Sequence, residues 1–160
     1  MITEEEVYTA LQDVKDPEIP TISVVDLGII TQVKLIDNNV EVTMTPTFSA
    51  CPALKILEAN VRERLQQMPF EEVSVKTTFD KPWNTNMISD RGREALLKRG
   101  LAPPPKHEGY FELDVLSDVA CPFCGSRNTT FESPFGATLC RAIHYCKNCK
   151  QGFEQFKPVE

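Results

Sequence analysis

The spacing of apolar residues predicts two amphipathic helices in the first half of the chain. Thr3, followed three residues later by Glu6, forms a capping-box pattern, and a helix is expected over residues 4–15. A second helix is expected from near Cys51 to Met68. The apolar positions that recur at intervals of three or four are Val7, Leu11 and Val14 in the first helix and Leu54, Leu57, Val61, Leu65 and Met68 in the second.

Alternating apolar and polar residues predict three strands. Residues 31–46 alternate on both sides of Asn38 and Asn39, two residues that tolerate the backbone of a tight turn, and this favours an antiparallel hairpin. Residues 71–79 are expected to form a third strand. The order helix, two strands, helix, strand predicts an α+β fold, a small two-layer domain with a mixed sheet and covering helices.

The chain changes character after residue 80, which predicts further modules. A proline-rich stretch contains one short helix, capped by Ser89 and ended by Gly100, and we expect it to dock because Trp83, Met87 and Leu96 need burial. The expected boundaries are residues 1–80 for the α+β domain, 81–110 for the docked linker and 111–160 for a small C-terminal module.

Composition narrows the class of protein and its compartment. The chain has 160 residues with 17 basic and 23 acidic side chains, a formal charge of −6, which disfavours nucleic acid as the general partner. The N-terminus opens with acidic residues rather than a basic and apolar signal, and no apolar run reaches the ~20 residues of a membrane span. We therefore expect a cytoplasmic protein, in which closely spaced cysteines are metal ligands or reactive thiols.

Two C-x-x-C pairs predict a tetrahedral metal site in the C-terminal module. Each pair can place two thiolates on one ion, and a closed shell of four sulfurs favours structural zinc, so the module is predicted to be a zinc ribbon. Iron on the same sulfurs, a pair of disulfides and a redox C-x-x-C are the alternatives. Between the pairs, Cys140 is expected to be a buried thiol and His144 to be exposed or hydrogen-bonded. The expected ligands are Cys121, Cys124, Cys146 and Cys149.

Cys51 stands apart from the other cysteines. Ser49 and Pro52 fit the cap and first turn of the following helix, so the thiol would lie at a helix N-terminus, where the dipole favours the thiolate. Thr47 belongs to the preceding T-P-T sequence, whose hydroxyls could hydrogen-bond an anionic sulfur. The opposing interpretation, a small hydrophobic residue in the core, has equal support from local chemistry.

Two aspartates lie near turns in the same half of the chain. Asp16 in DPEIP is interpreted as a helix-stop residue, whereas Asp26, between Val25 and Leu27, raises the question of why a carboxylate belongs in an apolar run. The sequence offers no set of nucleophile, base and orienting group and no phosphate loop, so we expect the chain not to be a catalyst itself.

Several motifs resemble a known family. DPEIP, VVDLGII and VTMTPTFSACPA resemble the SufT-like metal-sulfur cluster biosynthesis domain. The sequences KPWNTNMISDRGREALLKRGLAPP, CPFCGS and FGATLCRAIHYC extend the resemblance to the PaaD family, the D subunits of the phenylacetyl-CoA 1,2-epoxidase systems of aerobic phenylacetate degradation. The resemblance covers essentially the whole chain.

This resemblance implies an accessory role in a multicomponent monooxygenase. The role would be to assist maturation of iron-sulfur or iron sites, with the epoxidase reductase subunit as the expected client and the oxygenase subunit as a further partner. Cys51 would hold or pass iron or a transient iron-sulfur cluster, with Asp26 and Thr47 as candidate neighbours. One thiolate cannot complete a cluster, so a homodimer or a partner's ligands would be required. The alternative is a non-catalytic adaptor that bridges oxygenase and reductase, and a nucleic-acid-binding ribbon is the weakest interpretation.

Overall fold

The chain folds into an α+β unit and a ribbon unit, in agreement with the predicted fold class. The structure is a computed structural model that describes residues 1–47, 53–80, 83–105, 118–137 and 141–157. The two units are residues 1–83 with 87–92, and residues 84–86 with 93–160. The boundaries expected from the sequence, at residues 80 and 110, stay a prediction.

Helix α1, Glu4–Leu11, begins with the predicted capping box. Glu6 N donates to Thr3 Oγ1 at 3.2 Å and Thr3 N donates to Glu6 Oε2 at 2.7 Å, so two backbone N–H groups at the helix start are satisfied. The helix ends four residues earlier than predicted, because the chain turns and the amide of Val24 donates to the carbonyl of Val14 at 2.9 Å. Val14 remains in the core, 6% exposed, although it has left the helix.

A three-stranded mixed sheet forms the second layer of this unit. Strands β1 (Ile30–Ile36) and β2 (Asn39–Met44) are antiparallel, and β3 (Glu72–Thr77) lies parallel to β2 on its other side. The hairpin turn consists of Asp37 and Asn38, with Asp37 at a φ of 53°. The prediction of Asn38 and Asn39 as turn residues is therefore wrong by one position.

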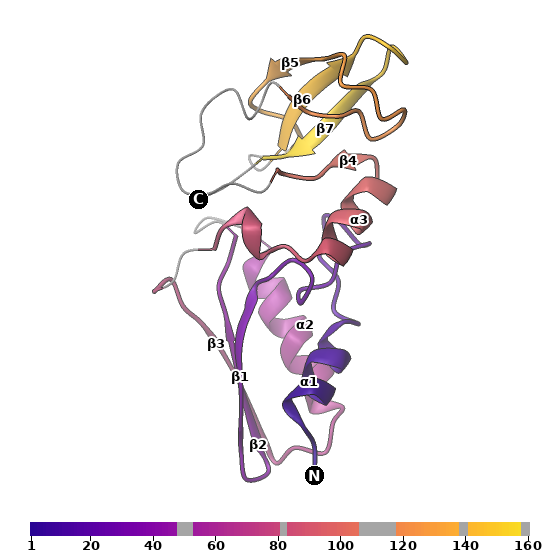
Figure 1. Cartoon of the computed structure of the whole chain (residues 1–160). Helices are drawn as coiled ribbons and strands as arrows, with labels where there is room; N and C mark the ends of the chain where they lie inside the picture. The colour runs from indigo at the N-terminus through magenta and orange to yellow at the C-terminus, as the bar shows by residue number, and fades with distance from the viewer. Residues whose placement is uncertain (48–52, 81–82, 106–117, 138–140, 158–160) are drawn as a thin grey trace. The chain divides into compact units, whose positions relative to one another are not determined.

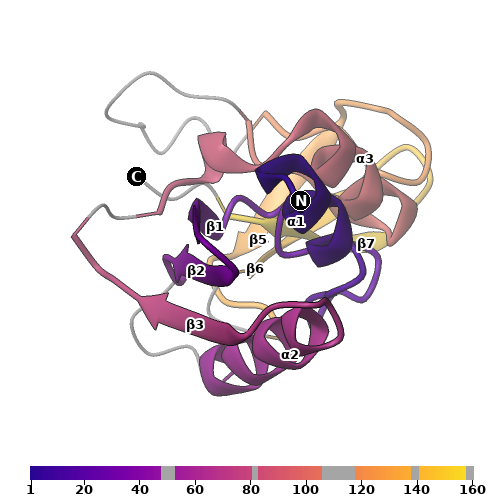
Figure 2. The same ribbon diagram turned by 90° about the horizontal axis from the view of Figure 1, so that it is seen from below.

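Helix α2, Leu54–Gln66, connects β2 to β3 and packs on the sheet. Its predicted apolar stripe is buried at Leu57, Val61 and Leu65, against the inward-facing side chains of the strands. Helix α1 contacts both α2 and β1, and Figures 1 and 2 show the two helices on the same face of the sheet. The opposite face is polar, with an ion pair between Lys76 and Glu41 at 2.6 Å.

The chain after β3 returns to the loop that precedes β1. The indole of Trp83 donates to the carbonyl of Leu27 at 2.9 Å, and Trp83 is only 2% exposed. Gly28 has a φ of +80° and lies directly against the backbone of Met87, where a side chain on the glycine would overlap the Met87 carbonyl. Leu96 is buried as expected, whereas Met87 is 38% exposed, so the expected burial of Met87 is wrong.

A 3₁₀ turn, η1 (Thr85–Met87), leads into helix α3, Asp90–Lys98, which has the predicted ends. Gly92 N donates to Ser89 Oγ at 3.0 Å, which makes Ser89 the N-cap. Gly100, with a φ of +79°, follows the last turn of the helix.

The ribbon unit contains a four-stranded sheet (Figure 1). The strand order is β4-β7-β6-β5, in which β5, β6 and β7 are antiparallel and β4 is parallel to β7. A small core beneath the sheet includes Val119, Phe153 and two of the predicted metal ligands, Cys121 and Cys146. The strand bounds are Leu101–Ala102, Thr129–Ser133, Arg141–Cys146 and Gly152–Phe156.

Within the parts of the chain that the structure describes, every helix is too short or too polar to cross a lipid bilayer.

Candidate functional site

The turn before β5 and the turn between β6 and β7 bring the four predicted ligands together. In the first turn, Cys121 N donates to Ser126 O at 2.9 Å and Gly125, with a φ of 75°, donates to Cys121 O. In the second, Cys146 N donates to Gln151 O at 2.9 Å. The four sulfurs all lie within 4.8 Å of one another; they belong to Cys121, Cys124, Cys146 and Cys149.

The separations of these sulfurs fit a tetrahedral metal ion. Cys121 Sγ lies 3.7 Å from Cys149 Sγ, and Cys124 Sγ lies 3.5 Å from Cys146 Sγ. Metal–sulfur bonds of about 2.3 Å in a tetrahedron place neighbouring sulfurs about 3.8 Å apart. A disulfide needs about 2.05 Å, so the predicted alternative of two disulfides does not apply to these cysteines. The four thiols are placed so that they could hold one metal ion.

Electrostatics within the site differ from one sulfur to the next. Cys121 and Cys146 are buried, Cys149 is half-buried and Cys124 is exposed. A backbone hydrogen bond from Ser126, followed by one from the side chain of Asn148, lowers the pKa of Cys124 to about 6. Burial raises the pKa of Cys149 to about 12, so the thiol of Cys124 ionises more readily than that of Cys149.

His144 belongs to the ribbon core rather than to the metal site. Its Nε2 lies 2.9 Å from Gln155 Oε1, and its ring is stacked on Phe153 with ring centroids 5.3 Å apart. Burial lowers the pKa of His144, and this side chain is 1% exposed. The expected hydrogen-bonding role is confirmed and the exposed alternative is wrong, whereas Cys140 lies outside the described residues.

Cys51 lies outside the described residues, but its flanks line a cleft. Helix α2 begins at Leu54, later than predicted. Its N-cap is Ala53, which makes no side-chain cap hydrogen bond. The predicted cap and first-turn residues, Ser49 and Pro52, also lie outside the described residues. The cleft holds about 20 Å³, which is room for one water molecule. Its described walls are Asp16, Leu27, Ile29, Pro46, Thr47, Leu54 and Leu57.

Asp16 lines this cleft, a position that the sequence did not indicate. Its Oδ1 accepts from the amides of Glu18 at 2.8 Å and Ile19 at 2.9 Å, which fixes the turn after α1. Asp16 and Thr47, one of the predicted neighbours of Cys51, both line the cleft. The interpretation of Asp16 in DPEIP as a helix-stop residue is confirmed, since its carboxylate fixes the turn that follows α1.

Asp26 makes a different set of contacts and is not among the described walls of the cleft. Its carboxylate accepts from Ser89 Oγ at 2.9 Å, from Arg91 Nε at 3.1 Å and from Ser23 Oγ at 3.1 Å. Burial alone would raise the pKa of Asp26, but these three hydrogen bonds outweigh it and hold the pKa below its ordinary value. The contacts explain why a carboxylate belongs in this apolar run, since it ties the loop before β1 to the segment before α3.

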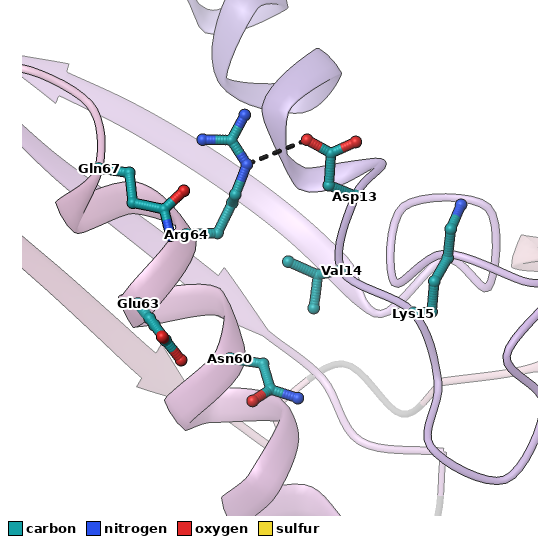
Figure 3. Close-up of a pocket in the computed structure, with 7 residues that line it drawn as sticks. All are labelled: Asp13, Val14, Lys15, Asn60, Glu63, Arg64 and Gln67. Atoms are coloured by element: carbon teal, nitrogen blue, oxygen red, sulfur yellow. Dashed lines mark hydrogen bonds and ion pairs between the residues drawn. The ribbon is translucent and has the colours of Figure 1, made fainter.

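A second hollow, of about 220 Å³, lies between the end of α1 and α2 (Figure 3). Arg64 Nε forms an ion pair with Asp13 at 3.1 Å across it. Lys15 and Glu63 add one further charge of each sign, so the hollow has no excess charge that would select an ionic ligand.

Two family models match the two parts of the chain. Residues 4–77 match a model described as iron-sulfur cluster assembly protein, and residues 106–157 match one described as PaaD zinc beta ribbon domain. The fold and the four-cysteine site thus define a class of protein, in which an iron-sulfur assembly domain is joined to a zinc ribbon.

Similarity to known proteins extends along nearly the whole chain. The chain is 35% identical over 154 residues to a protein of Escherichia coli described as a putative D subunit of 1,2-phenylacetyl-CoA epoxidase. That match covers 96% of this chain and 92% of the relative. The chain is also 39% identical over 100 residues to an Fe-S protein maturation auxiliary factor of Porphyromonas gingivalis. That match covers 61% of this chain and 91% of the relative. A crystal structure of the domain of unknown function DUF59 from Bacillus anthracis has a TM-score of 0.55 and 29% identity, over 58% of this chain and 90% of that one.

The chain belongs to the PaaD family, which is named for the D subunits of 1,2-phenylacetyl-CoA epoxidases, as its motifs predict.

Proposed function

We propose that this chain is an accessory maturation factor that assists assembly of an iron-sulfur or iron site in the phenylacetyl-CoA epoxidase, with the reductase subunit as its client. The observation that carries the proposal is the match of residues 4–77, which include Cys51, to the iron-sulfur assembly model. Similarity to an epoxidase component and to an Fe-S maturation factor supports the same role from two directions.

The working group in this proposal is the thiol of Cys51. Thr47 and Leu54, on either side of the segment that holds Cys51, line the cleft together with Asp16. Iron accepts both sulfur and oxygen ligands, so the carboxylate of Asp16 and the hydroxyl of Thr47 are suitable ligands in addition to the proposed thiolate. A cleft of about 20 Å³ has no room for a cluster. Iron or a cluster would therefore bind at its mouth, with further ligands from the client or from a second copy of this chain.

A buried hydroxyl, that of Thr45, stands next in sequence to Pro46, which lines this cleft. Thr45 is 2% exposed, and its Oγ1 has no hydrogen-bond partner among the described groups. A buried hydroxyl without a partner is costly, so a ligand that accepted a hydrogen bond from it would be stabilised. An anionic sulfur is such an acceptor.

In the ribbon, we propose zinc as the resident ion of Cys121, Cys124, Cys146 and Cys149. The sulfur separations of 3.5 and 3.7 Å support four-coordinate binding. Zinc in a closed shell of four thiolates supplies folding free energy and leaves no open position for chemistry. The chain's own residues then have a structural role here, because the two turns hold the sulfurs in place.

The proposal is tested on the client rather than on this chain. The reductase subunit would be purified from cells that carry the wild-type chain, Cys51→Ser or Cys140→Ser, and its iron and acid-labile sulfide measured per polypeptide. We expect Cys51→Ser to leave the client short of both, while Cys140→Ser, which removes a thiol elsewhere, leaves them near the wild-type level. Zinc bound to this chain should be the same in all three strains.

A normal iron content of the reductase in the Cys51→Ser strain would contradict the proposed role of this thiol. If that variant also co-purified with the reductase and oxygenase subunits, the chain would be an adaptor instead. Exposed aromatic side chains on the ribbon, Phe123 at 52% and Phe135 at 62%, support contact with protein partners in either case.

A further inference from the structure

The four residues of the predicted metal site differ in exposure: Cys124 is exposed, Cys149 is half-buried, and the other two are buried. Cys121 and Cys146 are 2% and 0% exposed and belong to the ribbon core, and Cys149 packs against that core. Cys124 is exposed and is not part of the described core cluster. Cys124 is therefore the most accessible of the four residues to a reagent that approaches from solvent.

The side chain of Asn148 contacts this exposed sulfur. Asn148 Nδ2 donates to Cys124 Sγ at 3.6 Å. Asn148 stands between Cys146 and Cys149 in the sequence, so the contact runs from the second C-x-x-C pair to the first. The amide nitrogen must be the atom that faces the sulfur, because the amide oxygen would be repelled by a thiolate. Such a hydrogen bond draws charge from the sulfur and makes it a weaker nucleophile.

We propose that Cys124 is the modification site of the ribbon, where soft electrophiles attack the metal-bound thiolate, and that Asn148 is a positioning residue that restrains this attack. The inference rests on the proposed zinc site and is independent of the role of Cys51. It assigns different chemistry to two cysteines that the spacing of the motif makes equivalent, Cys121 and Cys124.

The reaction with iodoacetamide illustrates the step and serves as the probe. The sulfur of Cys124 forms a bond to the carbon of the reagent, the carbon–iodine bond breaks and iodide leaves. The product is a neutral thioether, a weaker zinc ligand than a thiolate, so only three thiolates remain to hold the ion. Loss of zinc should therefore follow modification of this one residue.

The first measurement uses the unaltered, zinc-loaded chain. Zinc release on treatment with iodoacetamide would be followed with a colorimetric chelator, and samples quenched at successive times would be mapped by peptide mass spectrometry. Among the four ligands, Cys124 should carry the first modification, and its rate should equal the rate of zinc release. Earlier modification of another ligand would overturn the assignment, as would a chain that binds no zinc.

The second measurement tests Asn148 against a matched asparagine. Asn128 is an exposed asparagine of the same unit whose described hydrogen bonds are made by its backbone, to Ser126 Oγ and from Lys147 N. Asn148→Ala should release zinc about tenfold faster than the wild type, and Asn148→Asp faster still, because a carboxylate beside the sulfur increases its negative charge. Asn128→Ala should match the wild type.

Equal rates for Asn148→Ala and the wild type, at equal initial zinc content, would overturn the positioning role. Loss of client iron in the Cys51→Ser strain bears only on the proposed maturation function, so the two ideas fail separately.

Discussion

The carboxylate of Asp26 joins two segments of the α+β unit, and its removal should destabilise that unit. It accepts side-chain hydrogen bonds from Ser23, Ser89 and Arg91, and only 13% of the Asp26 side chain is exposed. Asp26→Ala removes these three contacts. The backbone contact from Ser89 N to Asp26 O, at 2.8 Å, remains.

The size of the effect follows from the exposure of each contact. Hydrogen bonds to a shielded charged group contribute about 1.5–3 kcal/mol each. The Arg91 contact contributes less than about 1 kcal/mol, because 65% of that side chain is exposed. The cost of burying the carboxylate offsets part of the sum. We expect Asp26→Ala to lower the free energy of unfolding by about 2–3 kcal/mol and Arg91→Ala by less than about 1 kcal/mol.

Trp83 provides an assay that reports on this unit alone. It is the single tryptophan of the chain, it is 2% exposed, and its indole donates to Leu27 within the same unit. Urea unfolding of the wild type, Asp26→Ala and Arg91→Ala would be followed by Trp83 fluorescence. The reasoning is refuted if Asp26→Ala lies within about 0.5 kcal/mol of the wild type, or if Arg91→Ala costs as much as Asp26→Ala.

The contribution of Asp26 to the free energy of unfolding should also depend on pH, in a direction set by its pKa. Burial acts to raise the pKa of Asp26, but hydrogen bonds from Ser89, Arg91 and Ser23 prevail and hold the pKa below the ordinary 3.8. A carboxylate with a lowered native pKa contributes stability that is present above its unfolded-state pKa and is lost as the pH falls through its native pKa. The difference in unfolding free energy between the wild type and Asp26→Asn should be constant above ~pH 5 and shrink below about 3.8. A difference that grows on acidification would contradict this.

Two further perturbations test the close packing and the metal. Gly28→Ala should cost the α+β unit more than about 2 kcal/mol, because its φ is +80° and the added carbon would overlap the Met87 carbonyl. Unfolding in urea, followed by Trp83 fluorescence, measures this cost, and wild-type stability would argue against the close approach. Removal of the metal with a strong chelator should abolish the β-sheet circular dichroism of the ribbon, since a structural zinc ion supplies about 10–16 kcal/mol, and leave Trp83 fluorescence unchanged. A ribbon that kept its β-sheet signal without metal would show that its apolar core is sufficient to hold it folded.

Features that neighbouring residues encode could be predicted from the sequence. The capping box of Thr3 and Glu6 needs only four residues, and the buried stripe of α2 needs only a repeat of three and four. The C-x-x-C spacing likewise holds two sulfurs close together whatever the rest of the chain does. These are the elements of the fold and the candidate metal site.

Features that depend on distant residues could not be predicted. Asp26 is bonded to Ser89, 63 positions away, and no local pattern pairs them. Helix α1 ends early because the carbonyl of Val14 accepts a hydrogen bond from the amide of Val24. This tertiary contact overrides the helical spacing of the apolar residues. Asp37 takes the turn position next to the predicted asparagines, since the buried faces of the two strands set the register and both residue types tolerate the turn.

The parallel pairing of β2 with β3 has a consequence for the order of folding. The hairpin pairs Ile36 with Asn39, which are close in sequence, whereas β2 meets β3 through pairs such as Asn39 with Glu72. Contacts that close long loops form later than local ones, so the hairpin should be complete before the crossover is. Residues 45–53, which include Cys51, open that crossover. A chain still emerging from the ribosome should therefore hold a completed β1–β2 hairpin, in which one edge of β2 stays unpaired until α2 has formed and β3 pairs beside it.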